Sequence, residues 1–158
     1  MDTLFDKKLQ TKTDRFIHLA LLAGNQALAE AQLDSHYTRD QIGVCLGVGI
    51  GGLKSVSQSG AILHERGTHG ISPFLIPRTI TNMAANWLSM KFDLQGPSLV
   101  ITSACSSSGD AIGHAFRMIR DGYCNAMIAG GAESCIIPIA IVAFGNMRAL
   151  SSWQGNPA

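Results

Sequence analysis

The chain has 158 residues, which corresponds to about one ordinary domain and is long enough to bury a hydrophobic core. Apolar residues make up 46% of it and charged residues only 15%, whereas about 25% of a typical soluble protein is charged. Intrinsic disorder is excluded because disordered chains are rich in charge and poor in apolar residues. The formal net charge is +1, so no electrostatic signal indicates binding to nucleic acid or to an anionic membrane.

The charges are unevenly distributed along the chain. Residues 97–158 carry only six charged side chains, which are Asp110, Arg117, Arg120, Asp121, Glu133 and Arg148. So few charges cannot cover the exposed surface of a small domain. We therefore expect this half to be covered by the rest of the chain or by another chain.

No segment has the pattern of a membrane span or of a secretory signal. The longest apolar run, residues 135–145, is shorter than the about 18 to 20 residues that a bilayer requires. Residues 1–15 carry charges of both signs and lack the apolar core of a secretory signal. These observations predict a cytoplasmic protein. Its four cysteines are expected to be free thiols without a metal, because their spacing matches no zinc motif.

The predicted elements alternate between helices and strands. A helix is expected over residues 14–31, where Asp14 provides an N-cap and one face carries Phe16, Leu19, Ala20, Ala23, Ala27 and Ala31. The elements then expected are strand 42–48, helix 53–66, loop 67–77, helix 79–91, strand 98–102, helix 106–121 and strand 125–130. Residues 136–150 fit either a strand or a helix. This alternation favours a parallel or mixed sheet with helices on its faces.

A glycine-rich segment follows the first predicted strand, with Gly47, Gly49 and Gly52 in the spacing G-x-G-x-x-G. In a dinucleotide-binding fold the next strand would end in an acidic residue about 20 positions further on. Residues 68–73 contain no acidic residue and do not have the pattern of a strand. The sequence therefore favours a tight turn with close backbone packing over a nucleotide site.

Cys105 occupies a position typical of a nucleophile. It lies between strand 98–102 and helix 106–121, where unpaired N–H groups and the helix dipole favour the thiolate. Its small neighbours leave room for a substrate and for N–H groups that stabilise an oxyanion. A buried structural cysteine is the alternative interpretation. His114 lies half a turn out of phase on the same helix, so a self-contained Cys–His hydrolase is poorly supported.

The segment around Cys105 resembles the nucleophile segment of the β-ketoacyl-acyl-carrier-protein synthases, which are condensing enzymes of thiolase fold. The match begins with Ser-Leu-Val-Ile-Thr-Ser-Ala-Cys-Ser-Ser-Ser-Gly at residues 98–109. Further matching segments, in family order, are residues 14–16, 49–52, 71–74, 82–83, 96–98, 112–115, 128–133, 144–145 and 148–151. The pattern is closest to the elongating, synthase II-like branch. The implied fold is α/β, with αβαβα layers, of which residues 1–158 form mostly the N-terminal half without its first strand.

The resemblance also implies a mechanism and a set of site residues. Cys105 would accept an acyl chain from an acyl-carrier protein, and malonyl-carrier protein would then lose carbon dioxide and extend that chain by two carbons. The backbone N–H of Cys105 would form part of an oxyanion hole. The acyl pocket would contain Ile50, Ala104 and Phe144, with Phe74 and Leu75 reaching it from a partner subunit. No cofactor or metal is implied, and Glu133 and His114 are interpreted as structural.

Partners and completeness follow from the same resemblance. A homodimer is implied through residues 98–103, from Ser98 to Ser103, which would pair antiparallel across a two-fold axis. The family carries two histidines and a lysine beyond the segment 148–151, so residues 1–158 are expected to be a fragment that is inactive in condensation, with a separate C-terminal half as a further partner. Three alternatives stay open: a fragment of a polyketide ketosynthase, a thiolase-type acyltransferase fragment, and a non-catalytic carrier-protein-binding or assembly module.

Overall fold

A three-stranded parallel sheet forms the centre of the protein. The computed structural model describes residues 7–153 and 155, and within them the strands are β1 (Ile42–Gly47), β2 (Ser98–Ile101) and β3 (Ala126–Gly131). Their order is β2-β1-β3, so the first strand lies between the other two. The parallel pairing matches Cys45 with Leu99 on one side and with Ala129 on the other. The expected α/β class with a parallel sheet is therefore confirmed.

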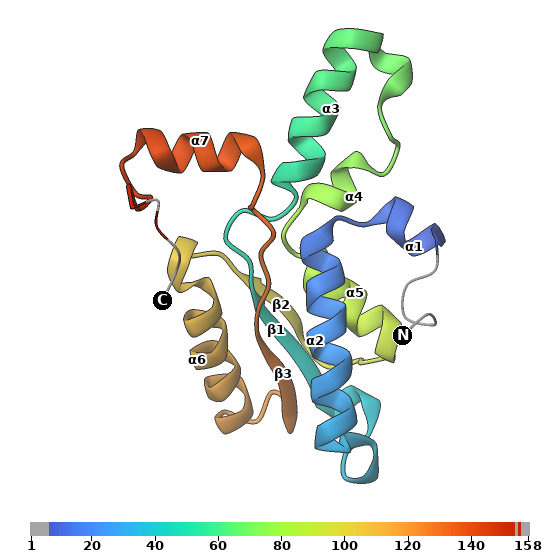
Figure 1. Cartoon of the computed structure of the whole chain (residues 1–158). Coiled ribbons are helices and arrows are strands. Elements are labelled where there is room, and N and C mark those ends of the chain that lie inside the picture. Colours follow the sequence, from blue (N-terminus) through green and yellow to red (C-terminus); the bar gives the residue numbers. More distant parts are fainter. Residues whose placement is uncertain (1–6, 154, 156–158) are drawn as a thin grey trace.

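Helices cover both faces of this sheet (Figure 1). They are α1 (Lys7–Lys12), α2 (Arg15–Ala31), α3 (Leu53–Arg66), α4 (Leu75–Thr79), α5 (Met83–Phe92), α6 (Ser107–Arg120) and α7 (Pro138–Asn146). Helices α2 and α5 pack together on one face, and α6 packs on the other. Helices α3 and α7 extend beyond the sheet, near the end at which its strands stop.

The predicted helix 79–91 is wrong at its start. The chain forms the short helix α4, and then Ile80 adopts an extended conformation, with φ −70° and ψ 136°, before α5 begins at Met83. Pro77 is tolerated in α4 because the first turn of a helix has N–H groups without intrahelical partners. The ambiguous segment 136–150 contains α7, with Pro138 at its first position.

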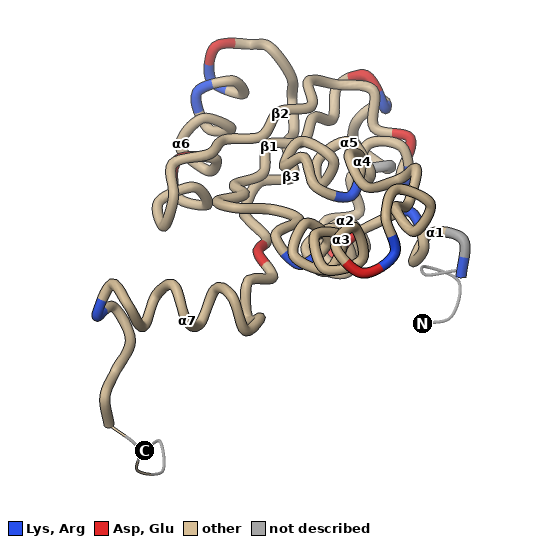
Figure 2. Tube along the Cα trace, turned by 90° about the horizontal axis from the view of Figure 1, so that it is seen from above, with Lys and Arg blue, Asp and Glu red and all other residues tan. Residues whose placement is uncertain are grey.

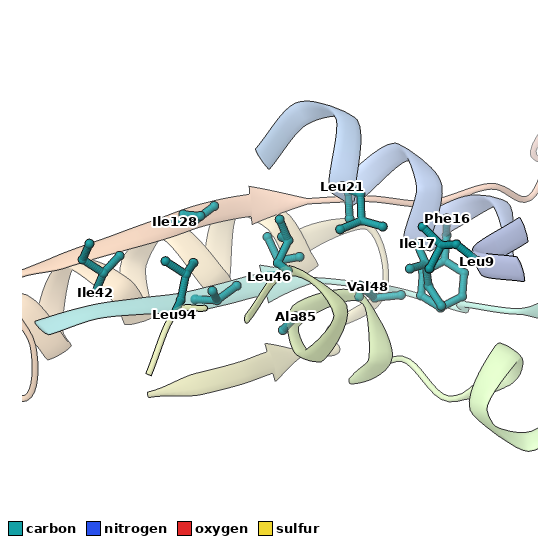
Figure 3. Close-up of a cluster of buried hydrophobic side chains, with 14 of the residues drawn as sticks. Leu9, Phe16, Ile17, Leu21, Ile42, Leu46, Val48, Ala85, Leu94 and Ile128 are labelled. Atoms are coloured by element: carbon teal, nitrogen blue, oxygen red, sulfur yellow. The ribbon is translucent and has the colours of Figure 1, made fainter. Parts of the chain in front are cut away.

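The main core lies between the sheet and the pair α2 and α5. Alternate residues of β1, namely Ile42, Val44 and Leu46, point to this face because successive side chains of a strand point to opposite sides. Figure 3 shows side chains from the helices meeting those of β1. The buried members are Leu9, Phe16, Ile17, Ala20, Leu21, Ile42, Val44, Leu46, Val48, Ala84, Ala85, Leu88, Leu94, Ala126 and Ile128.

The buried face of α2 differs from the expected one. Phe16 and Ala20 are buried as predicted, and they are joined by Ile17, Leu21 and Gly24. The other expected members, Leu19, Ala23, Ala27 and Ala31, are exposed. The buried stripe is therefore rotated toward the positions one residue later, because Ile17 and Leu21 fill the space above the sheet and Gly24 leaves room for Leu88 of α5.

The opposite face of the sheet is covered by small residues of α6. Ala111 and Ala115 pack against Cys45 and bring the helix close to the strands. The larger apolar residues Ile112 and Phe116 point away from the sheet and are 54% and 64% exposed. Helix α7 contains no charged residue, as the tan colour along its length in Figure 2 shows. The charge-poor half of the chain thus leaves an apolar surface uncovered by the described residues.

Candidate active site around Cys105

Two glycines allow α6 to begin directly on the sheet. A β-carbon on Gly47, the last residue of β1, would lie 2.2 Å from the carbonyl carbon of Ser107. A β-carbon on Gly131, the last residue of β3, would lie 1.9 Å from Oγ of Ser108. The close packing expected for the glycine-rich segment is present here, and it fixes the first turn of α6 against the carboxyl ends of the strands.

Ser107 closes the turn that carries Cys105. Its hydroxyl accepts the N–H of Ser103 at 2.9 Å and donates to the carbonyl oxygen of Ala104 at 2.7 Å. Ala104 has φ 52°, in the left-handed region that non-glycine residues rarely adopt. The hydroxyl of Ser103 donates to the carboxylate of Asp110 one turn into α6. This connection places Cys105 at the start of α6. Its left-handed residue Ala104 is a strained conformation of the kind that is common next to functional sites.

Cys105 is the only one of the four cysteines that is exposed. It belongs to the 3₁₀ turn Ala104–Ser106, between the end of β2 and the beginning of α6. In open parallel sheets, ligands bind beyond the carboxyl ends of the strands, and this is where Cys105 lies. The predicted placement of Cys105 between a strand and a helix is therefore present.

A cavity of about 600 Å³ opens beside the thiol, within the size range of small-molecule sites. Its lining consists of Gly47, Gly49, Ile50, Ala104, Cys105, Ser108, Gly131, Ala132, Glu133, Cys135, Phe144 and Met147. Four of the six predicted site residues thus meet at one cavity: Cys105, Ala104, Ile50 and Phe144.

The remaining two predicted residues lie elsewhere. Phe74 and Leu75 are not part of this lining in the described chain. Leu75 begins α4, and Phe74 precedes it with its ring 5.1 Å from Nζ of Lys12. The sequence resemblance had assigned both residues to the cavity of a partner subunit, and that assignment stays a prediction.

Three cysteines, Cys45, Cys124 and Cys135, have a thiol pKa above the ordinary value. Burial raises the pKa of Cys45 and of Cys124. Burial and then the carboxylate of Glu133 raise the pKa of Cys135 to about 11. Since the thiolate is the reactive form of cysteine, these three side chains are poor nucleophiles near neutral pH.

Sequence reasoning named only four of the twelve residues that line the cavity. Cys135 and Met147 line it, although neither belonged to the predicted site. Glu133 had been interpreted as structural, yet its carboxylate also lines the cavity and accepts the N–H of Ile50. The available signal was the position of Glu133 just beyond β3, at the same end of the sheet as Cys105. No histidine or lysine is among the described lining residues.

Comparison with models of protein families shows to which family the chain belongs. Residues 1–157 match the family model described as the N-terminal domain of β-ketoacyl synthase. The chain belongs to the β-ketoacyl synthase family. This confirms the family that was expected from the segment around Cys105.

Curated members of the β-ketoacyl synthase family are similar along almost the whole chain. A 3-oxoacyl-[acyl-carrier-protein] synthase 2 from Synechocystis is 40% identical over 153 residues, which are 96% of this chain and 37% of the relative. The synthase 2 of Vibrio cholerae is 41% identical over 152 residues, with the same two shares. The chain thus spans little more than a third of the length of these relatives.

Solved ketosynthase structures share the fold. A β-ketoacyl synthase from Burkholderia phymatum has a TM-score of 0.79 at 26% identity and covers 93% of this chain, which corresponds to 36% of that structure. The solved complex of a type II polyketide acyl-carrier protein with its ketosynthase contains a chain with a TM-score of 0.85 at 21% identity. The match covers 94% of this protein and 44% of that chain. The predicted thiolase-like fold, present in part, is confirmed.

Proposed function

We propose that Cys105 is the acyl-accepting nucleophile of an elongating 3-oxoacyl-acyl-carrier-protein synthase of fatty acid biosynthesis. The observation that carries the proposal is the exposed thiol at the start of α6, opening into a cavity whose walls include Ile50, Phe144 and Met147. Apolar walls of this kind suit an aliphatic chain. The relatives named synthase 2 support the elongating class.

The first chemical step is acyl transfer between two sulfur atoms. The Cys105 thiolate attacks the carbonyl carbon of an acyl-carrier-protein thioester, and the backbone N–H of Cys105 stabilises the negative charge on its oxygen. The carrier's thiolate then leaves and takes up a proton from solvent, while Cys105 retains the acyl group as a new thioester.

The second step extends that acyl group. Malonyl-carrier protein loses carbon dioxide, and the carbanion that remains attacks the Cys105 thioester and releases the Cys105 thiolate. Decarboxylation requires groups that stabilise the developing negative charge. Since no histidine or lysine is among the described residues that line the cavity, we expect residues 1–158 to perform acylation without extension.

Acyl and malonyl forms of a carrier protein are the proposed partners, together with a second copy of the chain. A ketosynthase of the same fold has been solved with its acyl-carrier protein, which supports the first partner. Strand β2 is at the edge of the described sheet and pairs there with β1 alone, which supports antiparallel pairing through Ser98–Ser103. Among the described residues no helix is long and apolar enough to cross a membrane. We propose that the assembly acts in the cytoplasm.

The proposal is tested by incubating residues 1–158 with palmitoyl-acyl-carrier protein and identifying the modified residue by mass spectrometry of peptides. We expect one acyl adduct, located on Cys105, and none in Cys105→Ala. Cys124→Ala is the matched control, because Cys124 is buried away from the cavity, and it should be acylated as the parent is.

Two results would overturn the proposal. Acylation that persists in Cys105→Ala would assign the reaction to another thiol. Carrier-protein binding without any acylation of the folded chain would favour the alternative of a non-catalytic binding module.

A further inference from the structure

The carboxylate of Glu133 holds the turn that forms one wall of the Cys105 cavity. Just beyond β3, the N–H of Ala132 donates to the carbonyl oxygen of Gly47 at 3.0 Å, so the chain leaves the sheet beside the end of β1. The next residue is Glu133, and its carboxylate accepts the N–H of Ile50 at 2.6 Å and the N–H of Gly51 at 3.1 Å. Bonds of this kind, between N–H groups and a charged acceptor, are stronger than those between neutral groups.

The backbone at Gly51 is shaped to receive this carboxylate. Successive N–H groups converge on one anion when a residue adopts the left-handed conformation, and Gly51 has φ 76°. The same carboxylate also accepts the N–H of Ser134 at 3.2 Å. Because both of its oxygens are engaged by backbone donors, Glu133 acts as a holding group rather than as a base for the thiol.

Gly49 connects this interaction to the nucleophile. A β-carbon on Gly49 would lie 3.1 Å from Oε2 of Glu133 and 3.3 Å from the carbonyl oxygen of Ala104, which immediately precedes Cys105. Gly49 is thus packed closely between the carboxylate of Glu133 and the backbone of Ala104, with no room for a side chain. Loss of the carboxylate would free the turn and let Ile50 shift relative to the thiol.

We propose that Glu133 is a positioning residue that selects which acyl chains reach Cys105, because it fixes the Ile50 wall of the cavity. The inference rests on the proposed function insofar as the cavity is taken to be the acyl site. A long chain must pass along the wall that Ile50 forms with Phe144, whereas a small reagent needs only to reach the sulfur. The two kinds of reagent therefore separate a change in cavity shape from a change in thiol reactivity.

The test measures how fast Cys105 reacts with a series of N-alkylmaleimides, from N-ethyl to N-decyl, in the parent chain and in Glu133→Gln. Mass spectrometry of peptides assigns each adduct to its cysteine. We expect the ratio of the decyl rate to the ethyl rate to fall by about 10-fold in Glu133→Gln, since small displacements in a site have effects of this size or larger. The ethyl rate itself should change less than about twofold, because the thiol remains accessible.

Glu65→Gln is the matched control, because Glu65 lies on the exposed surface of α3 and should leave the ratio unchanged. If Glu133→Gln does not fold, Glu133→Asp applies the same test, since it keeps the charge but withdraws the carboxylate by one methylene group. Amide hydrogen exchange at Ile50 and Gly51 gives a second readout and should become faster in either variant.

The proposal is overturned if folded variants keep the parent ratio, if all maleimide rates change in parallel, or if exchange at Ile50 and Gly51 is unaltered. Its failure is distinguishable from failure of the proposed function, because the maleimide series requires no carrier protein. A chain that resists acylation but shows the altered ratio would refute the acyltransfer proposal and retain the role of Glu133 in shaping the cavity beside Cys105.

Discussion

Gly47 contacts Ser107 so closely that no side chain fits between them. A β-carbon at residue 47 would overlap the Ser107 carbonyl group, which belongs to backbone and cannot rotate away. This contact joins the central strand to the first turn of α6. The position of Cys105 therefore depends on a glycine distant in the sequence.

We predict that Gly47→Ala destabilises the chain by about 2–4 kcal/mol and slows alkylation of Cys105. The added methyl group must push α6 away from the sheet, and overpacking typically costs about 1–3 kcal/mol, occasionally more. Urea denaturation gives the stability, and the iodoacetamide rate gives the accessibility of the thiol.

Gly60→Ala is the control for Gly47→Ala. Nothing lies within 4 Å of a β-carbon at Gly60, which is in the middle of α3, so this variant should be stabilised by about 0.5–1 kcal/mol. If both glycine variants had the same stability, the contact between Gly47 and Ser107 would have no energetic role.

Cys105 and Cys135 are predicted to react with alkylating reagents at different rates. Exposed Cys105 should be alkylated first, while Cys135 should be slow because its pKa is raised to about 11 by burial and by Glu133. At that pKa roughly one Cys135 side chain in a thousand is a thiolate at pH 8. The rate of Cys135 should therefore rise about tenfold per pH unit between pH 8 and pH 10.

Isotope-coded alkylation followed by peptide mass spectrometry measures these rates separately. Glu133→Gln removes a cause of the raised pKa and should accelerate the reaction of Cys135 at pH 8. An alkylation rate of Cys135 that does not change between pH 8 and pH 10 would contradict the raised pKa of this thiol.

The sequence predicted β1 and Cys105 well, for physical reasons. A short apolar run that ends at a glycine-rich turn favours a buried strand, and all six residues of β1 are buried. The placement of Cys105 between a strand and a helix was also predictable from local information, and its role as a nucleophile stays a proposal. Both features are determined by neighbouring residues.

Features that depend on distant contacts could not be predicted from local pattern. On α6 the helical spacing places Ile112, Ala115, Phe116 and Ile119 on one side, yet of these four only Ala115 is buried, and it packs against the sheet together with Ala111. Only small side chains fit between α6 and β1, because the helix lies so close to the strand. The association of Ile50 and Phe144 with Cys105 was likewise inferred only from family resemblance, since no local spacing relates these segments.

Asp14 is predicted to stabilise two helices at once. Its carboxylate caps α2 by accepting the N–H of Arg15 at 2.6 Å, and it accepts both the N–H, at 3.1 Å, and the hydroxyl of Ser55 in the first turn of α3. Asp14→Ala should reduce the free energy of unfolding by about 2–4 kcal/mol, since it removes a cap and leaves buried donors without a partner. Urea denaturation measures the loss.

Ser35→Ala is the matched control for Asp14→Ala. The hydroxyl of Ser35 donates to the carbonyl oxygen of Gln32 at an exposed position, so its loss should change the stability by less than about 0.5 kcal/mol. Equal effects of the two substitutions would show that the buried position of Asp14 is unimportant.

His18 is predicted to make the chain less stable in mild acid. Burial is the largest cause that lowers its pKa below 6.5, and Arg78, Arg15 and Lys54 lower it further, whereas Asp14 acts in the opposite direction. The hydroxyl of Thr13 donates to the carbonyl oxygen of Leu9, so it accepts a hydrogen bond from Nε2–H of His18, which lies 2.7 Å away. This geometry fits a neutral imidazole with its proton on Nε2.

The direction of the pH effect follows from proton uptake. As the pH falls through about 6.5, His18 takes up a proton in the unfolded chain but not in the folded one, so the free energy of unfolding decreases until the lower pKa of the folded state is reached. His18→Gln keeps a donor near Thr13 but does not titrate. Urea denaturation at pH 7.5 and pH 5.5 should therefore show a smaller loss of stability in His18→Gln than in the parent chain. An equal loss in the two proteins would assign the acid sensitivity to other groups.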